Sequence, residues 1–166
     1  MPSLSHALLT ALKDQGAHEI FGIPGDYVLP LFKVIEESNI LPSFTLSHEQ
    51  AVGFAADASA RYHGGFGVVV VTYGAGALNT VNSIAGAYAE RSPVVVIAGA
   101  PATRERASGF LLHHQARTID TQLAVFKQTH LRSGGAGRSC NRTCPDRACV
   151  AQRAGDVAAG LSRISS

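Results

Sequence analysis

The chain has 166 residues, and its fourteen Lys and Arg against twelve Asp and Glu give a formal net charge of +2 at pH 7. No stretch approaches the roughly 20 apolar residues that span a bilayer, and the arginines are scattered without aromatic interleaving, which argues against a nucleic-acid surface. The start of the chain lacks a basic segment followed by a long apolar run, the pattern of a secretory leader. We therefore expect a cytoplasmic protein without membrane or nucleic-acid partners.

The composition changes near His130. All eleven Phe and Tyr residues precede it, and residues 1–130 hold eight Lys and Arg against ten Asp and Glu. Residues 131–166 hold six Arg, no Lys, two Asp and all three cysteines. The sequence thus divides into one domain at 1–130 and an Arg-, Ser-, Gly- and Cys-rich tail at 131–166. The tail has too few large aliphatic residues to repay the entropy of ordering it, so we expect it to be disordered.

Helical and strand patterns alternate along the domain. The continuous Val-rich runs at 67–73 and 93–98 are typical of strands buried on both faces. Strands separated by helices imply right-handed crossovers, so we predict an α/β fold with a parallel sheet and helices on both faces. The predicted helices cover residues 4–15, 27–37, 48–62 and 78–89, and the other predicted strands cover 19–23 and 44–46.

Two acidic residues lie near predicted strand ends, where ligands of parallel sheets gather. Asp26 follows the turn Pro24-Gly25 and is either the N-cap of the next helix or a catalytic group. Glu49 lies at a helix start, with Ser47 as the predicted N-cap and Gln50 completing a capping box. Its carboxylate either complements the helix dipole or performs chemistry.

A glycine-rich turn and a histidine pair complete the set of candidate segments. The stretch TYGAGALN joins a strand to a helix and resembles half of a dinucleotide fingerprint, but Asn79 replaces the third glycine and no acid ends the next strand. His113 and His114 are either a surface pair, stray metal ligands, or two coupled groups that exchange protons near neutral pH.

Four stretches together resemble the N-terminal, pyrimidine-binding domain of thiamine-diphosphate-dependent 2-keto acid decarboxylases: GIPGDY, LSHEQAVGFAADASARYHG, VTYGAGALNTVNSIAGAYAERSPVVVIAGAP and GFLLHHQARTIDTQLAVFK. They cover about the first 129 residues in register. The histidine pair with Asp26 upstream is similar to the pyruvate, indolepyruvate and phenylpyruvate decarboxylase branch.

The resemblance implies catalytic roles for four residues. Glu49 would hydrogen-bond the aminopyrimidine ring of thiamine diphosphate and favour the imino tautomer that removes the thiazolium proton, while the electron-accepting chemistry belongs to the cofactor. Asp26, His113 and His114 would transfer protons during decarboxylation and aldehyde release.

The resemblance also implies cofactor contacts around the glycine-rich turn. Thr72, Gly74 and Asn79 would line this turn beside the pyrimidine. Gly25 would serve the turn after the first strand.

Family members are about three times as long as this chain, and they hold the diphosphate and Mg²⁺ in a C-terminal domain through a Gly-Asp-Gly segment and an asparagine pair. No such segment occurs in this sequence, so we expect no metal ligands for Mg²⁺ here. The resemblance further implies a 2-keto acid substrate and a homo-oligomer, dimer or tetramer, whose sites form between subunits. This chain would carry half a site and would be inactive alone.

The tail permits several interpretations. Its composition is that of a GC-rich coding sequence translated out of frame, which suggests a truncated enzyme; a natural basic linker is the alternative. Zinc binding by Cys140, Cys144 and Cys149 is disfavoured because no Cys-x₂-Cys pair is present. Two function classes stay open for the chain: a fragment of a decarboxylase, or an inactive binding or interaction module.

Overall fold

The computed structural model describes residues 3–129, 133–134 and 149–151. Their strands form one parallel sheet in the order β2-β1-β3-β4-β6-β5. The strands are β1 (Ile20–Gly22), β2 (Ser43–Thr45), β3 (Gly67–Val71), β4 (Val94–Ala98), β5 (Ser133–Gly134) and β6 (Cys149–Ala151). The predicted parallel α/β class is confirmed.

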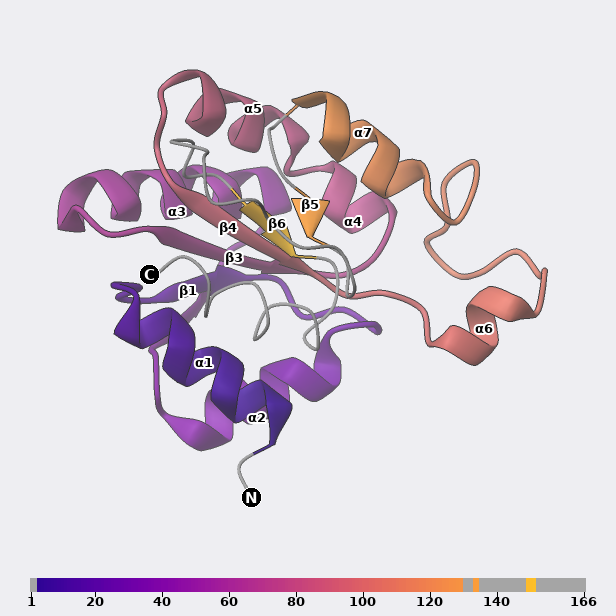
Figure 1. The fold of residues 1–166 in the computed structure, drawn as a ribbon, viewed down its shortest axis with the longest axis horizontal. Coiled ribbons are helices and arrows are strands. Elements are labelled where there is room, and N and C mark those ends of the chain that lie inside the picture. Colours follow the sequence, from indigo (N-terminus) through magenta and orange to yellow (C-terminus); the bar gives the residue numbers. More distant parts are fainter. Residues whose placement is uncertain (1–2, 130–132, 135–148, 152–166) are drawn as a thin grey trace.

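Helices cover both faces of the sheet (Figure 1). Helices α1 and α2 pack on one face, and α3, α4, α5 and α7 lie on the other, while α6 projects to one side. Their bounds are α1 (Leu4–Asp14), α2 (Leu29–Ser38), α3 (Glu49–His63), α4 (Ala75–Leu78), α5 (Val81–Ala89), α6 (Thr103–Ala107) and α7 (Thr121–Thr129). None of the described helices is long and apolar enough to cross a membrane.

The sheet separates two apolar cores. Val68 and Val70 of β3 pack with residues of α1 and α2, whereas Val69 and Val71 pack with residues of α3, α5 and α7. Every residue of β3 and β4 is buried. The uninterrupted Val-rich pattern therefore reflects alternate side chains entering opposite cores, which fixes the register of the central strands.

Helix α3 starts differently from the prediction. Its N-cap is His48 rather than Ser47, and Nδ1 of His48 accepts a hydrogen bond from the backbone N–H of Gln50 over 3.2 Å. A histidine nitrogen thus performs the capping that the hydroxyl of Ser47 was expected to provide, which makes Glu49 the first helical residue. The other end agrees with the prediction, because Gly64 adopts the left-handed conformation with φ of 74°.

Two other helices also differ from the sequence pattern. The predicted helix 78–89 corresponds to α5, which begins at Val81, and a separate short helix, α4, precedes it from Ala75 to Leu78. Helix α2 begins at Leu29 with Val28 as its N-cap and with Pro30 in its first turn. Since Val28 holds the cap position, the N-cap interpretation of Asp26 is wrong.

Five residues of the 131–166 segment are described, and they belong to the sheet. Strand β6 pairs with β4, with Val96 opposite Val150, and β5 pairs with β6. Neither strand is predicted from the sequence, because two or three residues are too few to show a period. The predicted junction at His130 and the expectation of disorder for the rest of the tail lie outside the described residues.

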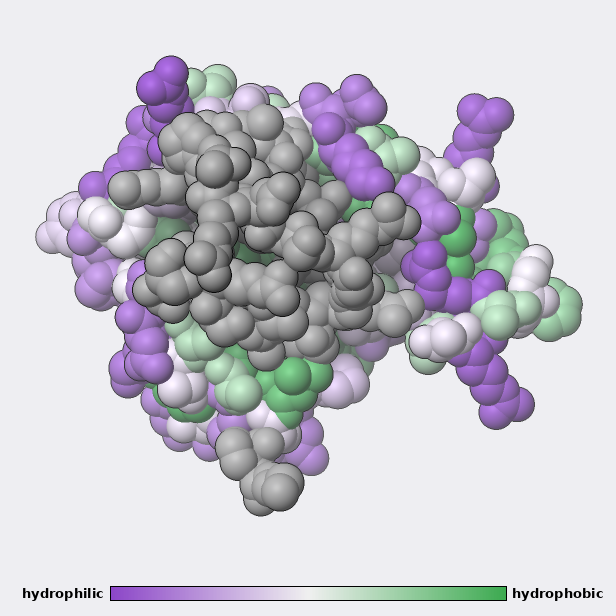
Figure 2. All heavy atoms as spheres, in the orientation of Figure 1, coloured by the Kyte–Doolittle hydropathy of each residue, from purple (hydrophilic) through white to green (hydrophobic). Residues whose placement is uncertain are grey.

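The part of the chain around α6 forms a projection with exposed apolar side chains. Phe110 and Leu111, in the loop that follows α6, are 79% and 78% exposed. Figure 2 shows hydrophobic residues on the projection at the right of the molecule, beside strongly hydrophilic ones. The loop 108–120 therefore packs little of its own apolar surface.

Candidate active site

The carboxyl ends of β1, β2 and β3 bring most of the predicted site residues to one edge of the sheet. Gly25 and Asp26 follow β1, and Thr72 and Gly74 follow β3. Glu49 opens α3, four residues after β2 ends at Thr45. The parallel topology explains this grouping, because every strand of such a sheet ends at the same edge.

Glu49 is held from one side by the turn after β3. Its carboxylate oxygen Oε2 accepts a hydrogen bond from Nδ2 of Asn79 over 3.1 Å. The other oxygen, Oε1, would lie 3.3 Å from a Cβ built on Gly76, so a side chain at position 76 would crowd the carboxyl group. Glu49 is only partly buried and therefore remains accessible to a ligand.

Thr72 forms the floor of the same space. A Cβ on Gly76 would lie 2.7 Å from Cγ2 of Thr72, and a Cβ on Gly25 would lie 2.7 Å from its Cβ. Gly25 is not among the glycines with positive φ, so close packing on Thr72, and not turn geometry, requires a glycine there. Among the described residues, Oγ1 of Thr72 is the buried side-chain oxygen that has no hydrogen-bond partner.

An unpaired buried hydroxyl costs about 1–3 kcal/mol, so it marks a place where a ligand atom gains by binding. Thr72, Gly76 and Glu49 together form a small cradle, with an unsatisfied hydroxyl, a bare backbone and a carboxylate. We call these three residues the cradle. It suits a planar ring that carries hydrogen-bonding nitrogens.

Asp26, His113 and His114 form a second cluster. Nε2 of His113 lies 3.4 Å from Oδ2 of Asp26, and the two imidazole rings lie 3.9 Å apart between centroids with a tilt of 51°. The side chains of His113 and Asp26 are 66% and 68% exposed. A carboxylate beside two imidazoles can accept and return protons to a bound molecule.

The histidine pair is fixed to the turn after β3 through its backbone. The carbonyl oxygen of His114 accepts a hydrogen bond from the N–H of Ala75 over 3.2 Å, and His114 has a φ of 60°. A Cβ on Gly74 would clash with that carbonyl oxygen, and Gly74 itself has a φ of 72°. Gly74 is therefore required both for its own conformation and for the approach of the histidine loop.

An ion pair closes the base of this loop. Arg106 of α6 lies 2.7 Å from Oδ1 of Asp120, the residue before α7. The loop between them carries both histidines. Its position is thus set by this pair and by the backbone contact of His114.

Two residues that support the site are not predicted from the sequence. Gln122, only 2% exposed, accepts a hydrogen bond on Oε1 from the N–H of Gly74 over 2.7 Å. Tyr73, 1% exposed, donates its hydroxyl to the carbonyl of Ile119 over 2.8 Å. The four-residue spacing of Gln122 and Phe126 places both on one face of α7. It could have predicted a buried hydrogen bond of Gln122, because a glutamine on a buried face needs a partner.

Burial raises the pKa of Tyr73 above its ordinary value, and the charge of Asp120 adds to this effect while Arg106 opposes it. Burial likewise raises the pKa of Tyr27, with smaller contributions from Glu105 and Asp26. The rings of Tyr27 and Tyr73 meet edge to face at 5.5 Å. Both phenols therefore stay neutral at physiological pH.

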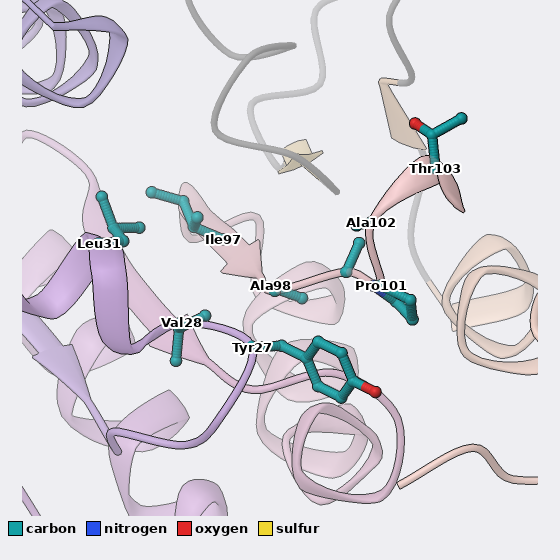
Figure 3. Close-up of a pocket in the computed structure, with 10 residues that line it drawn as sticks. Tyr27, Val28, Leu31, Ile97, Ala98, Pro101, Ala102 and Thr103 are labelled. Atoms are coloured by element: carbon teal, nitrogen blue, oxygen red, sulfur yellow. The ribbon is translucent and has the colours of Figure 1, made fainter. Parts of the chain in front are cut away.

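A pocket of about 420 Å³ is lined by Tyr27 but not by Glu49, Thr72, Asp26 or the histidine pair. Figure 3 shows its lining, which comes from the start of α2, the end of β4 and the segment that follows β4. Tyr27 is the titratable residue of this lining, and the rest is apolar or a small hydroxyl. The chemistry-bearing side chains lie outside it, so the pocket offers shape rather than catalysis.

The fold and the strand-end residues define a parallel α/β domain with its candidate site at the carboxyl ends of the strands. Residues 2–125 match the family described as thiamine pyrophosphate enzyme, N-terminal TPP binding domain. The chain belongs to this family, as its motifs predicted.

Three relatives illustrate the match. The chain is 68% identical over 125 residues to the indole-3-pyruvate decarboxylase of Azospirillum brasilense. The aligned region covers 75% of this chain and 23% of that protein. It is 38% identical over 142 residues to the pyruvate decarboxylase of Aspergillus parasiticus, covering 86% of this chain and 24% of that protein. A probable acetolactate synthase large subunit of Methanocaldococcus jannaschii is 42% identical over 100 residues, with 60% and 17% covered. The chain spans about a quarter of the length of the two decarboxylases.

Proposed function

We propose that this chain supplies the pyrimidine side of the active site of a thiamine-diphosphate-dependent 2-keto acid decarboxylase. The substrate class would be pyruvate, phenylpyruvate or indolepyruvate, and the products an aldehyde and carbon dioxide. The 68% identity to an indole-3-pyruvate decarboxylase favours an arylpyruvate. The observation that carries the proposal is the cradle, where the carboxyl group of Glu49 and the methyl group of Thr72 lie beside the bare backbone of Gly76, and where the buried Oγ1 of Thr72 has no hydrogen-bond partner.

The residues of the cradle fit the aminopyrimidine ring. Thr72 offers a buried hydroxyl that needs a partner, and the glycine at position 76 keeps the Glu49 carboxyl group uncrowded. Asn79 would keep the Glu49 carboxyl group oriented through its bond to Oε2. When bound, thiamine diphosphate supplies the carbon nucleophile and the electron sink for decarboxylation.

The chain's own groups would then bind and move protons. Glu49 would hydrogen-bond a ring nitrogen through its carboxyl group. Asp26, His113 and His114 would transfer protons to and from the substrate side, because their atoms lie close together and remain accessible. Gly74 would act indirectly, by allowing the approach of the His114 backbone.

The rest of the site would come from elsewhere. We propose that the diphosphate and Mg²⁺ are held outside the residues described here, by a C-terminal domain of the same family in a neighbouring subunit. A dimer or tetramer is the corresponding assembly. A cytoplasmic location remains a prediction.

The test combines binding and complementation. Calorimetric titration of the purified chain with thiamine diphosphate and Mg²⁺ should give an affinity no better than roughly millimolar, about −4 kcal/mol, because the charged end of the cofactor has no partner here. Mixing the chain with the remainder of the Azospirillum relative should restore release of carbon dioxide from indolepyruvate. Glu49→Gln should abolish this activity, whereas Glu36→Gln, at an exposed site on α2, should not.

Two results would contradict the proposal. Micromolar binding by the chain alone would mean that it contains a complete site. Activity in the mixture that survives Glu49→Gln would remove Glu49 from its role. A mixture that assembles without activity would instead support an interaction module.

A further inference from the structure

Asp26, His113 and His114 place three metal-binding atoms together at the sheet edge. One ligand atom from each residue lies within 4.8 Å of the other two. The closest pair, Nε2 of His113 and Oδ2 of Asp26, is 3.4 Å apart. Two imidazoles and one carboxylate are the donor set of many sites for divalent transition metals.

The distances suit a tetrahedral ion. Ligand atoms at about 2.0–2.1 Å from Zn²⁺ lie about 3.4 Å from one another in a tetrahedron. The His113 and Asp26 pair already has this separation, so the ring of His114 needs to approach by at most about 1.4 Å. The exposure of the His113 and Asp26 side chains lets them rotate without disturbing the core.

The backbones that carry these side chains are fixed by the fold. Asp26 follows Gly25, whose carbonyl accepts hydrogen bonds from the N–H groups of Val28 and Leu29 over 2.8 and 3.1 Å. The carbonyl of His114 is bound to the N–H of Ala75. The site is therefore partly preorganised, which reduces the cost of collecting three ligands around one ion.

We propose that Asp26, His113 and His114 bind a divalent transition-metal ion, with Zn²⁺ and Co²⁺ as the ions that fit. Water or a ligand oxygen would take the fourth position. Imidazole nitrogens favour these ions over Mg²⁺, which prefers oxygen ligands in an octahedron. This binding is separate from the Mg²⁺ of the proposed enzyme. A bound ion would occupy the same side-chain atoms that the proposed function uses for proton transfer, so the two uses exclude each other.

The test must exclude two competing groups. Cys140, Cys144 and Cys149 offer thiolates, so the chain is first alkylated with iodoacetamide. His18 and His63, whose rings stack at 4.0 Å, lie beside Glu19 and form another group of two histidines and a carboxylate. His63→Ala is therefore the matched control.

The alkylated chain is titrated with Co²⁺, and the visible d–d absorption of the tetrahedral ion is followed; Zn²⁺ is then added to displace it. We expect saturable absorption that one equivalent of Zn²⁺ removes. His113→Ala, His114→Ala and Asp26→Asn should each weaken Co²⁺ binding roughly tenfold or more, while His63→Ala leaves it unchanged. Far-ultraviolet circular dichroism confirms that each variant is folded.

Three outcomes would overturn the proposal. The first is a folded, alkylated chain that gives no tetrahedral Co²⁺ spectrum at millimolar metal. The second is binding that all three site variants retain. The third is binding that disappears in His63→Ala, which would assign the metal to the opposite edge of the sheet.

Discussion

The side-chain amide of Asn79 donates a hydrogen bond to Oε2 of Glu49 over 3.1 Å, across 30 positions of the sequence. This contact joins the residue that follows α4 to the first residue of α3. It orients the carboxyl group so that Oε1 lies toward the space at Gly76. The geometry of the candidate acid is thus set by two strand ends and not by its own helix alone.

Gly76→Ala should fill the cradle and destabilise the domain. The new methyl group would lie 2.7 Å from Cγ2 of Thr72 and 3.3 Å from Oε1 of Glu49, with little room to relax. We expect a loss of about 1–3 kcal/mol in the free energy of unfolding, measured by urea denaturation. Gly86→Ala is the control, since nothing lies within 4 Å of its added Cβ in α5. That control should gain about 0.5–1 kcal/mol, and equal effects at both sites would refute a tight cradle.

Gly74→Ala should cost more than a left-handed conformation alone. Gly64 has a similar φ, 74° against 72°, but its ψ of 8° is that of a left-handed helix, and a Cβ there meets nothing within 4 Å. Gly64→Ala therefore measures the cost of a left-handed conformation, about 1–2 kcal/mol. Gly74 has a ψ of −121°, where a side chain is strained further. Gly74→Ala adds the clash with the His114 carbonyl and should be clearly less stable in the same urea titration. Similar losses in the two variants would show that the loop moves away without cost.

Gln122→Ala should destabilise the domain, because Gln122 of α7 holds the glycine-rich turn through a hydrogen bond from Gly74. Removal of the side chain leaves the N–H of Gly74 without its partner, at a cost of about 1–3 kcal/mol, in addition to the cavity. Gln128→Ala, at an exposed position of the same helix, should change stability by no more than about 0.5 kcal/mol. Thermal unfolding of both variants compares them directly. A neutral Gln122→Ala would contradict the role assigned to this hydrogen bond.

Tyr73→Phe should make the free energy of unfolding fall less steeply with pH under alkaline conditions. Burial raises the pKa of Tyr73 above 10.0, so the folded state disfavours the phenolate. The resulting stabilisation is full below pH 10.0 and is lost as the pH rises through the raised pKa. Tyr73→Phe has no phenol to ionise, so it does not lose stability in this way at high pH. At neutral pH it is less stable than the original protein by about 1 kcal/mol, because it lacks the hydrogen bond to Ile119. The test is the free energy of unfolding of each variant, measured as a function of pH across this range. Tyr62→Phe is the control, because Tyr62 is 86% exposed. The same pH dependence in both variants would disprove the role of Tyr73.

The fold follows from the sequence where the pattern is long. The Val-rich strands and the helices between them are predicted within a few residues, because burial on two faces leaves an uninterrupted apolar run. The short β5 and β6 carry no such pattern. The capping by His48 is missed because Ser47 is the commoner cap and local sequence does not say which residue is extended.

The candidate site is predicted in part. Glu49, Asp26 and the histidine pair follow from the motifs, and the structure brings Glu49 together with Thr72 and Asn79. Gln122 and Gly76 act through contacts between distant segments, which spacing along the chain does not reveal. The requirement for glycine at position 25 likewise comes from Thr72, 47 residues away in a different strand end.

The bond from the Ala75 amide to the His114 carbonyl is a local probe of whether the histidine loop stays on the sheet edge. The amides of β3 exchange with solvent only when the paired sheet opens, whereas the Ala75 amide becomes free as soon as loop 108–120 lifts. Deuterium uptake at Ala75 therefore reports loop opening separately from global unfolding. Faster uptake at Ala75 than in β3 would show that the loop carrying His113 and His114 leaves the site while the sheet stays intact.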